Sequence, residues 1–255
     1  MKTQEEINES WSESSKNYSW IIDNEIESFR KEKWQNRILR QINKAPEEIR
    51  VLDTGCGPGF FSIILSMKGC RVTGIDGAEG MINEARAKAA CYGVAPEIMK
   101  MDCHEMTFPD NTFDLVVSRN VTHALRDHKQ VYKEWLRVLK PGGILLIFDA
   151  NWHLPICNEK LREESIRRFN ETTEKYGDAF NKYTKDRDEH FEEEITHEHI
   201  LGDLVRPDWD MGLLAGLGYE NISCERNIIE EMWDEKEILL YGHTPMFMIR
   251  AQKHE

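Results

Sequence analysis

The sequence lacks the patterns by which membrane and secreted proteins are recognised. It contains no run of about eighteen apolar residues, so a membrane-spanning helix is not expected. The N-terminus reads Met-Lys-Thr-Gln-Glu-Glu and is not followed by the apolar core of a signal peptide. We therefore expect a cytoplasmic protein that does not bind membranes.

Cysteine and histidine are present without the spacings that metal sites require. The six cysteines form no C-x-x-C pair, which argues against both a zinc site and a disulfide framework. No H-E-x-x-H motif is present, although His190, Glu194, His197 and His199 lie close together in a charged stretch. Such a stretch is typical of a solvated helix face, so no metal is predicted.

Basic residues are in deficit. The 255 residues include 46 acidic and 33 basic side chains, which gives a formal net charge of −13. Because nucleic acids attract basic proteins, this balance argues against a nucleic-acid partner and favours a small-molecule substrate. The length suits one domain with an inserted lobe, and either a monomer or a homodimer is compatible with it.

Two common nucleotide-binding fingerprints are missing, although a glycine-rich turn is present. Glycines at 55, 57 and 59 lie in V-L-D-T-G-C-G-P-G-F-F, between a β-prone run and an apolar helical pattern. Glycine lets a strand bend sharply into a helix and approach a ligand. Phe60 stands where a dinucleotide site needs its third glycine, and no lysine precedes Lys68, so a dehydrogenase or triphosphate loop does not fit. Asp53 beside the turn would attract an ammonium or sulfonium group, which indicates a cationic ligand.

The motif D-T-G-C-G-P-G at residues 53–59 resembles the first motif of the class I S-adenosylmethionine-dependent methyltransferases. F-P-D-N-T-F-D at 108–114 resembles a second motif of that family. R-N-V-T at 119–122 and R-V-L-K-P-G-G at 137–143 most resemble the ubiquinone and menaquinone methyltransferases of the type 11 group. The resemblance implies S-adenosyl-L-methionine as cofactor, S-adenosyl-L-homocysteine as product, and direct in-line transfer of a methyl group to O, N, S or C of a small molecule.

The order of the elements predicts an α/β, Rossmann-like fold with a seven-stranded, mostly parallel sheet and an antiparallel C-terminal hairpin. Strands are expected near 49–54, 70–76, 96–101, 113–117, 144–148, 219–229 and 246–252. We expect four segments: an N-terminal helical cap (1–44, with one helix over 21–42), a cofactor-binding core (45–153), a helical lid inserted after the fifth strand (154–206), and the C-terminal part of the core (207–255).

The predicted cofactor contacts lie around the glycine turn and the next strand ends. Asp76 ends the second strand about twenty residues beyond the turn, where nucleotide folds place a carboxylate against ribose hydroxyls. By resemblance to the family, Tyr18 closes the pocket, Met81 lines the adenine site, Asp102 accepts from the adenine amino group, and the Cys103 amide contacts the ring. The full predicted set is Tyr18, Asp53, Gly55, Cys56, Gly57, Gly59, Asp76, Gly77, Met81, Asp102, Cys103, Arg119 and Asn120.

His123 and His153 are the predicted catalytic residues. Each follows a strand end at the edge where doubly wound sheets bind ligands, and histidine titrates near neutral pH. A general base is needed only if the acceptor is protonated at neutral pH, and the alternative for either histidine is a packing role. Trp152, Tyr18 and Trp20 could form an aromatic wall for a planar or cationic acceptor.

Two other functions stay open. An RNA methyltransferase would need a basic groove, against which the acidic balance argues. A non-catalytic S-adenosylmethionine-binding regulator would bind the cofactor while the space above the methyl group was blocked.

Overall fold

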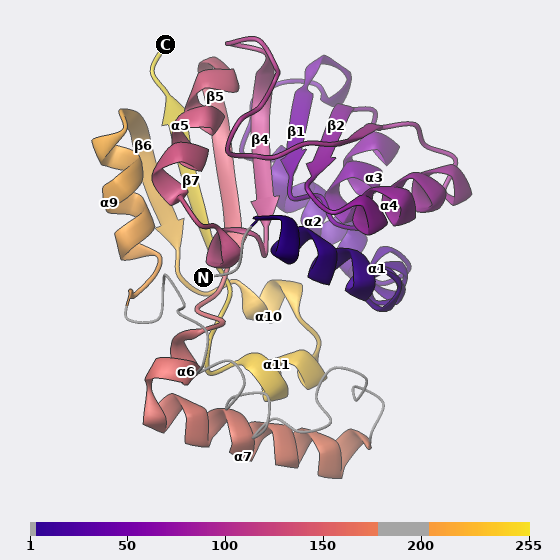
Figure 1. The fold of residues 1–255 in the computed structure, drawn as a ribbon, viewed down its shortest axis with the longest axis vertical. Helices are drawn as coiled ribbons and strands as arrows, with labels where there is room; N and C mark the ends of the chain where they lie inside the picture. The colour runs from indigo at the N-terminus through magenta and orange to yellow at the C-terminus, as the bar shows by residue number, and fades with distance from the viewer. Residues whose placement is uncertain (1–3, 178–203) are drawn as a thin grey trace.

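A seven-stranded sheet forms the centre of the computed structural model, which describes residues 4–177 and 204–255 (Figure 1). The strand order is β3-β2-β1-β4-β5-β7-β6. The first five strands in this order are parallel, and β7 is antiparallel to both β5 and β6. The predicted Rossmann-like α/β fold is confirmed.

The strands agree closely with the predicted ranges. Their bounds are β1 Arg50–Thr54, β2 Arg71–Asp76, β3 Glu97–Lys100, β4 Phe113–Arg119, β5 Leu139–Asp149, β6 Tyr219–Glu225 and β7 Phe247–Lys253. The fifth strand begins earlier than expected and includes the Pro-Gly-Gly segment. A bulge in β5 explains the earlier start of the strand. Phe113 pairs with Leu139 whereas Leu115 pairs with Ile144, so extra residues of β5 lie between the two pairs.

Helices cover both faces of the sheet. The larger ones are α1 Gln4–Ile26, α2 Arg30–Leu39, α3 Phe60–Met67, α4 Glu79–Cys91, α5 His128–Val138, α7 Glu159–Tyr176 and α9 Asp208–Gly216. Successive strand residues point to opposite faces. Val51 packs with side chains of α2, α3 and α4, whereas its neighbour Leu52 packs with those of α5 and α9.

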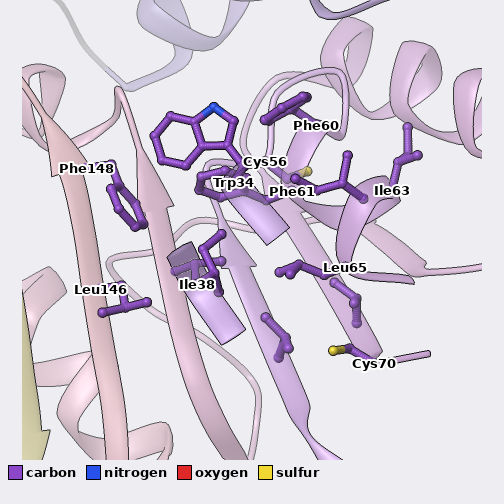
Figure 2. Close-up of a cluster of buried hydrophobic side chains, with 14 of the residues drawn as sticks. Trp34, Ile38, Cys56, Phe60, Phe61, Ile63, Leu65, Cys70, Leu146 and Phe148 are labelled. Atoms are coloured by element: carbon purple, nitrogen blue, oxygen red, sulfur yellow. The ribbon is translucent and has the colours of Figure 1, made fainter. Parts of the chain in front are cut away.

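Aromatic side chains fill the first of these two cores (Figure 2). The Trp34 ring of α2 meets the rings of Phe61 and Phe148 edge-on, with centroid distances of 5.2 and 4.9 Å. Edge-to-face pairs of this kind stabilise a core beyond the area they bury. They fix α2 and α3 against the carboxyl end of β5, beside the glycine turn.

The N-terminal cap consists of two helices, so the single helix expected over residues 21–42 is wrong. Ser28 lies at the break between α1 and α2. Its hydroxyl donates to the Glu25 carbonyl (2.8 Å) and accepts from the Arg30 N–H (3.2 Å). Serine commonly replaces helical backbone bonds in this way. After the break, α2 packs in the same core as α3, while α1 packs on α4.

A helical layer lies at the carboxyl ends of the parallel strands (Figure 1). It contains α7 and three short helices, α6 Leu154–Cys157, α10 Ile229–Met232 and α11 Glu235–Tyr241. The Arg168 guanidinium of α7 donates to the carbonyls of Ile238 and Leu239, which joins α7 to α11. The sequence did not indicate α10 and α11, so β6 and β7 are joined through helices rather than by a tight hairpin.

Two sequence-based expectations fall partly or wholly outside the described residues. His190, Glu194, His197 and His199 lie there, as does the middle of the expected lid at 154–206. Within residues 4–177 and 204–255, no helix has the length and apolar character needed to cross a membrane.

Candidate functional site

A pocket lies at the carboxyl edge of the sheet, between the ends of β1, β2 and β4 and the helix α1. Twelve of the thirteen predicted cofactor residues line it. They are Tyr18, Asp53, Gly55, Cys56, Gly57, Asp76, Gly77, Met81, Asp102, Cys103, Arg119 and Asn120. The sequence reasoning missed the contribution of Gln4, Ile7 and Asn8 from the start of α1, and of His104.

Gly59 is the predicted residue that does not line this pocket. It stands at the N-terminus of α3 with a φ of +88°. A β-carbon at this position would lie 3.1 Å from the Ala85 β-carbon of α4. The third glycine of the turn therefore allows α3 to begin and to pack closely on α4.

The first glycine has a different role. Gly55 has a φ of +64°, and a β-carbon there would lie 2.4 Å from a methyl carbon of Val121. Gly57 has open space beside it, with the Tyr18 ring 4.0 Å from its ideal β-carbon. The turn thus presents bare backbone to the pocket, with Val121 on one side and Tyr18 on the other.

Asp76 is held by backbone amides at the pocket wall. Its two carboxylate oxygens accept the N–H groups of Gly57 and Ala78, each at 2.9 Å. Burial raises the pKa of the Asp76 carboxyl, and these two bonds oppose that rise. Each oxygen keeps lone pairs for a further donor, which suits a vicinal diol.

Asp53 lies deeper, at the end of β1. One of its oxygens accepts from both the Ser62 N–H (2.8 Å) and the Ser62 hydroxyl (2.7 Å). Burial raises the pKa of the Asp53 carboxyl to about 6 in spite of these bonds. Burying an ionised carboxylate costs free energy unless a positive charge lies nearby. A buried aspartate beside the pocket is therefore expected if the site receives a cation.

Replacing Asp53 by asparagine is expected to stabilise the chain at alkaline pH. A carboxyl whose pKa rises from 3.8 to about 6 on folding favours the folded state below pH 3.8, and this advantage is lost as the pH rises through 6. Above pH 6 the ionised group costs about 3 kcal/mol, so Asp53→Asn should recover up to that amount at pH 8 and little at pH 4. Urea denaturation at both pH values measures it. Asp110→Asn, at an exposed carboxylate, is the control, and an equal gain at both pH values would contradict the expectation.

Arg119 joins the end of β4 to the helix α1. Its guanidinium donates to both oxygens of Glu25, at 2.6 and 2.8 Å, and lies 4.4 Å from the centre of the Phe60 ring. Glu25 is buried and also accepts from the Trp34 indole N–H. The ion pair therefore fixes the second half of α1 against the pocket, a contact that no local pattern in the sequence indicated.

The first half of α1 approaches the turn after β2 very closely. A β-carbon at Gly77 would lie 2.6 Å from the Asn8 side chain, and one at Gly80 would lie 2.6 Å from the Ser12 carbonyl. The Gly80 N–H donates to the Ser12 hydroxyl (3.3 Å). Glycine at 80 therefore allows α1 to pack closely against the start of α4.

Another part of the pocket wall is the segment that follows β3, which contains Asp102, Cys103 and His104. Potential ligand atoms of these three residues lie within 4.8 Å of one another. Burial raises the pKa of the Cys103 thiol to about 12. All three residues line the pocket.

Neither predicted catalytic histidine lines the pocket itself. His123 lies just beyond it, in the short helix η2 Thr122–Ala124, where its neighbours Val121 and Ala124 are wall residues. Its Nδ1 atom is 3.0 Å from the Asp149 carboxylate, which also accepts the His123 backbone N–H (2.8 Å). The His153 ring is 5.4 Å from the His123 ring.

Asp149 stands at the centre of a buried polar network that the sequence did not reveal. It accepts from the Thr122 hydroxyl (2.6 Å) and from the Arg206 guanidinium (3.2 Å). Burial alone would raise the pKa of Asp149, but His123 and Arg206 hold it well below its usual range. A permanently ionised Asp149 fixes the His123 ring with its other nitrogen, Nε2, directed away from the carboxylate.

The aromatic wall predicted from Trp152, Tyr18 and Trp20 is wrong. Trp20 is 64% exposed, because residues two apart on a helix face in different directions. Trp152 instead lies against Trp233 and Tyr241 of the C-terminal helical layer, with ring centres 6.1 and 5.6 Å away. Its indole N–H donates to the side-chain oxygen of Asn120 (3.3 Å), which is a residue of the pocket wall.

Comparisons with known proteins find similarity to methyltransferases. Residues 52–147 match the family model described as a methyltransferase domain. A sterol 24-C-methyltransferase from Gibberella zeae is 34% identical over 122 residues, covering 47% of this chain and 32% of the relative. A demethylmenaquinone methyltransferase from Bacillus licheniformis is 31% identical over 140 residues, covering 53% of this chain and 59% of the relative.

Solved structures share the fold. Phosphoethanolamine N-methyltransferase 2 of Haemonchus contortus, in complex with phosphomonomethylethanolamine and S-adenosylhomocysteine, has a TM-score of 0.59 at 19% identity. The similarity covers 87% of this chain and 52% of that one. The chain thus spans only about one third to three fifths of the length of these proteins.

The fold and the pocket define the chain as a Rossmann-like α/β protein with a nucleotide-type site at the carboxyl edge of its sheet. Residues 52–147 match the methyltransferase-domain family model, in agreement with the resemblance found in the motifs. This match and the methyltransferase names of the similar proteins support the predicted cofactor, S-adenosyl-L-methionine.

Proposed function

We propose that the chain transfers a methyl group from S-adenosylmethionine to a small-molecule acceptor. The observation that carries this proposal is the pocket itself, in which bare glycine backbone, two acidic strand ends and a covering helix come together. S-adenosylmethionine supplies a methyl group already activated on a sulfonium, so the protein mainly has to hold and orient the reactants.

The residues present fit this cofactor. The Asp76 carboxylate would accept the ribose hydroxyls, and Asp53 would face the positive charge of the methionine end. Arg119 adds a cation close by for a carboxylate. The helix α1, fixed by the Arg119–Glu25 ion pair, excludes water from above, and Tyr18 contributes to the same cover.

The acceptor side would lie between the pocket and the helical layer. The relatives named above act on a sterol, on demethylmenaquinone and on phosphoethanolamine, so the acceptor atom differs among similar proteins. His123, oriented by Asp149, is the residue placed to take a proton from an acceptor that has one to lose. The net charge of −13 supports a small molecule rather than RNA as the acceptor.

Replacing Asp76 by alanine is expected to weaken the binding of S-adenosylmethionine and S-adenosylhomocysteine about 10- to 100-fold, because charged hydrogen bonds to the ribose are lost. Isothermal titration calorimetry of the parent chain and the variant measures this change. Asp110→Ala removes an exposed carboxylate and should leave both affinities unchanged. A parent chain that binds neither ligand would refute the proposed function. Tight binding without turnover of any acceptor would favour the regulator.

A further inference from the structure

His104 lies in the pocket wall next to Asp102, and the two side chains are tied together. The Asp102 oxygen Oδ1 accepts the His104 backbone N–H (2.9 Å) and lies 2.7 Å from the ring atom Nδ1. The bond to His104 is the main reason why the pKa of the Asp102 carboxyl lies below its ordinary value. An ionised Asp102 can only accept, so Nδ1 carries the proton of a neutral ring and Nε2 is left with a lone pair.

The Nε2 atom of His104 is the unusual feature. It is buried, and it forms no hydrogen bond with any of the residues 4–177 and 204–255. The side chain as a whole is only 13% exposed and lines the pocket. A buried acceptor without a partner is costly, which indicates that a donor comes from a ligand.

We propose that His104 Nε2 accepts an N–H of the adenine amino group of the bound nucleoside, beside the acceptor that Asp102 provides. This inference rests on the proposed function, since it assigns a further contact within the same cofactor site. An amino group has two N–H donors, and the Asp102–His104 pair offers two fixed acceptors. The pair would therefore select an amino-purine over a purine that lacks the amino group or carries a carbonyl in its place.

The test compares S-adenosylhomocysteine with its 6-deamino analogue, which lacks only the amino group. In His104→Asn the side-chain amide can still donate to Asp102, but the acceptor at Nε2 is gone. We expect the variant to bind S-adenosylhomocysteine about tenfold more weakly than the parent, and the deamino analogue with an affinity within about twofold of the parent's. Calorimetry provides all four dissociation constants.

Gln130→Ala serves as the matched control. The Gln130 amide donates to the His104 carbonyl (3.0 Å) and does not touch the ring, so its removal loosens the same loop without changing Nε2. It should weaken both ligands equally or not at all. The same loss for both ligands in His104→Asn, or no loss for either, would overturn the inference and leave the proposed function standing. A parent chain that binds neither ligand would overturn both.

Discussion

Replacing His123 by asparagine is expected to lower kcat by about 10²- to 10⁴-fold with an acceptor that must lose a proton, which is the usual contribution of a general base. Asparagine can donate to Asp149 as Nδ1 does, but it has no second nitrogen to take a proton. The affinity for S-adenosylhomocysteine should stay at the parent value, because His123 lies outside the cofactor pocket. Single-turnover kinetics with an acceptor identified by screening, together with calorimetry, measure both quantities.

His153→Asn is the matched control for this prediction. His153 lies 5.4 Å from His123, ring centre to ring centre, and it is the His123 ring whose Nδ1 lies 3.0 Å from the buried Asp149 carboxylate. We therefore expect less than about a tenfold change in kcat for the control, the size of an indirect effect. A large loss in His153→Asn with none in His123→Asn would exchange the two roles. No loss in either would mean that the acceptor attacks the methyl carbon without a histidine first taking a proton from it.

Much of the fold and most of the pocket could be predicted because they depend on short stretches of sequence. Short β-prone runs mark the central strands, and the glycine turn with Asp76 defines the nucleotide edge. Strand ends in a parallel sheet meet at one edge, so Arg119 could be assigned to the site from its position, whereas Asp102 was assigned by resemblance to the family.

The parts that could not be predicted depend on contacts between distant residues. Glu25 reaches Arg119 across 94 residues, and Arg206 reaches Asp149 across 57. Neither pair has a local spacing that would distinguish it from surface charges. The helices α10 and α11 were missed because helices of four and seven residues are too short to show a clear period.

His104 shows a further limit of sequence reasoning. Asp102 was predicted by resemblance to the family, but no family motif indicated the histidine two positions after it. Only the structure reveals that Nδ1 is bonded to Asp102 while Nε2 is buried in the pocket wall. The fold of the loop determines which ring nitrogen bonds to Asp102 and which one remains for another partner. This determines what His104 can bind.

Replacing Arg206 by methionine is expected to lower the free energy of unfolding by about 3–5 kcal/mol, the cost of breaking a buried ion pair from one side. The Arg206 guanidinium is 2% exposed and lies between the carboxylates of Asp149 and Asp210, which are both fully buried. Without it, two buried charges face each other across the space that methionine fills. Urea denaturation at pH 7 measures the loss, and adding Asp210→Asn should recover part of it because one of the uncompensated charges is removed.

Arg226→Met provides a control in the same part of the chain. Arg226 also pairs with an aspartate of α9, Asp208, but the two side chains are 59% and 60% exposed. Exposed pairs contribute little, so the expected change is within about 0.5 kcal/mol. Equal effects of the two substitutions would contradict the buried network. A large loss confined to Arg206→Met would show that the Asp149 carboxylate, which orients His123, depends on an arginine that follows it by 57 residues.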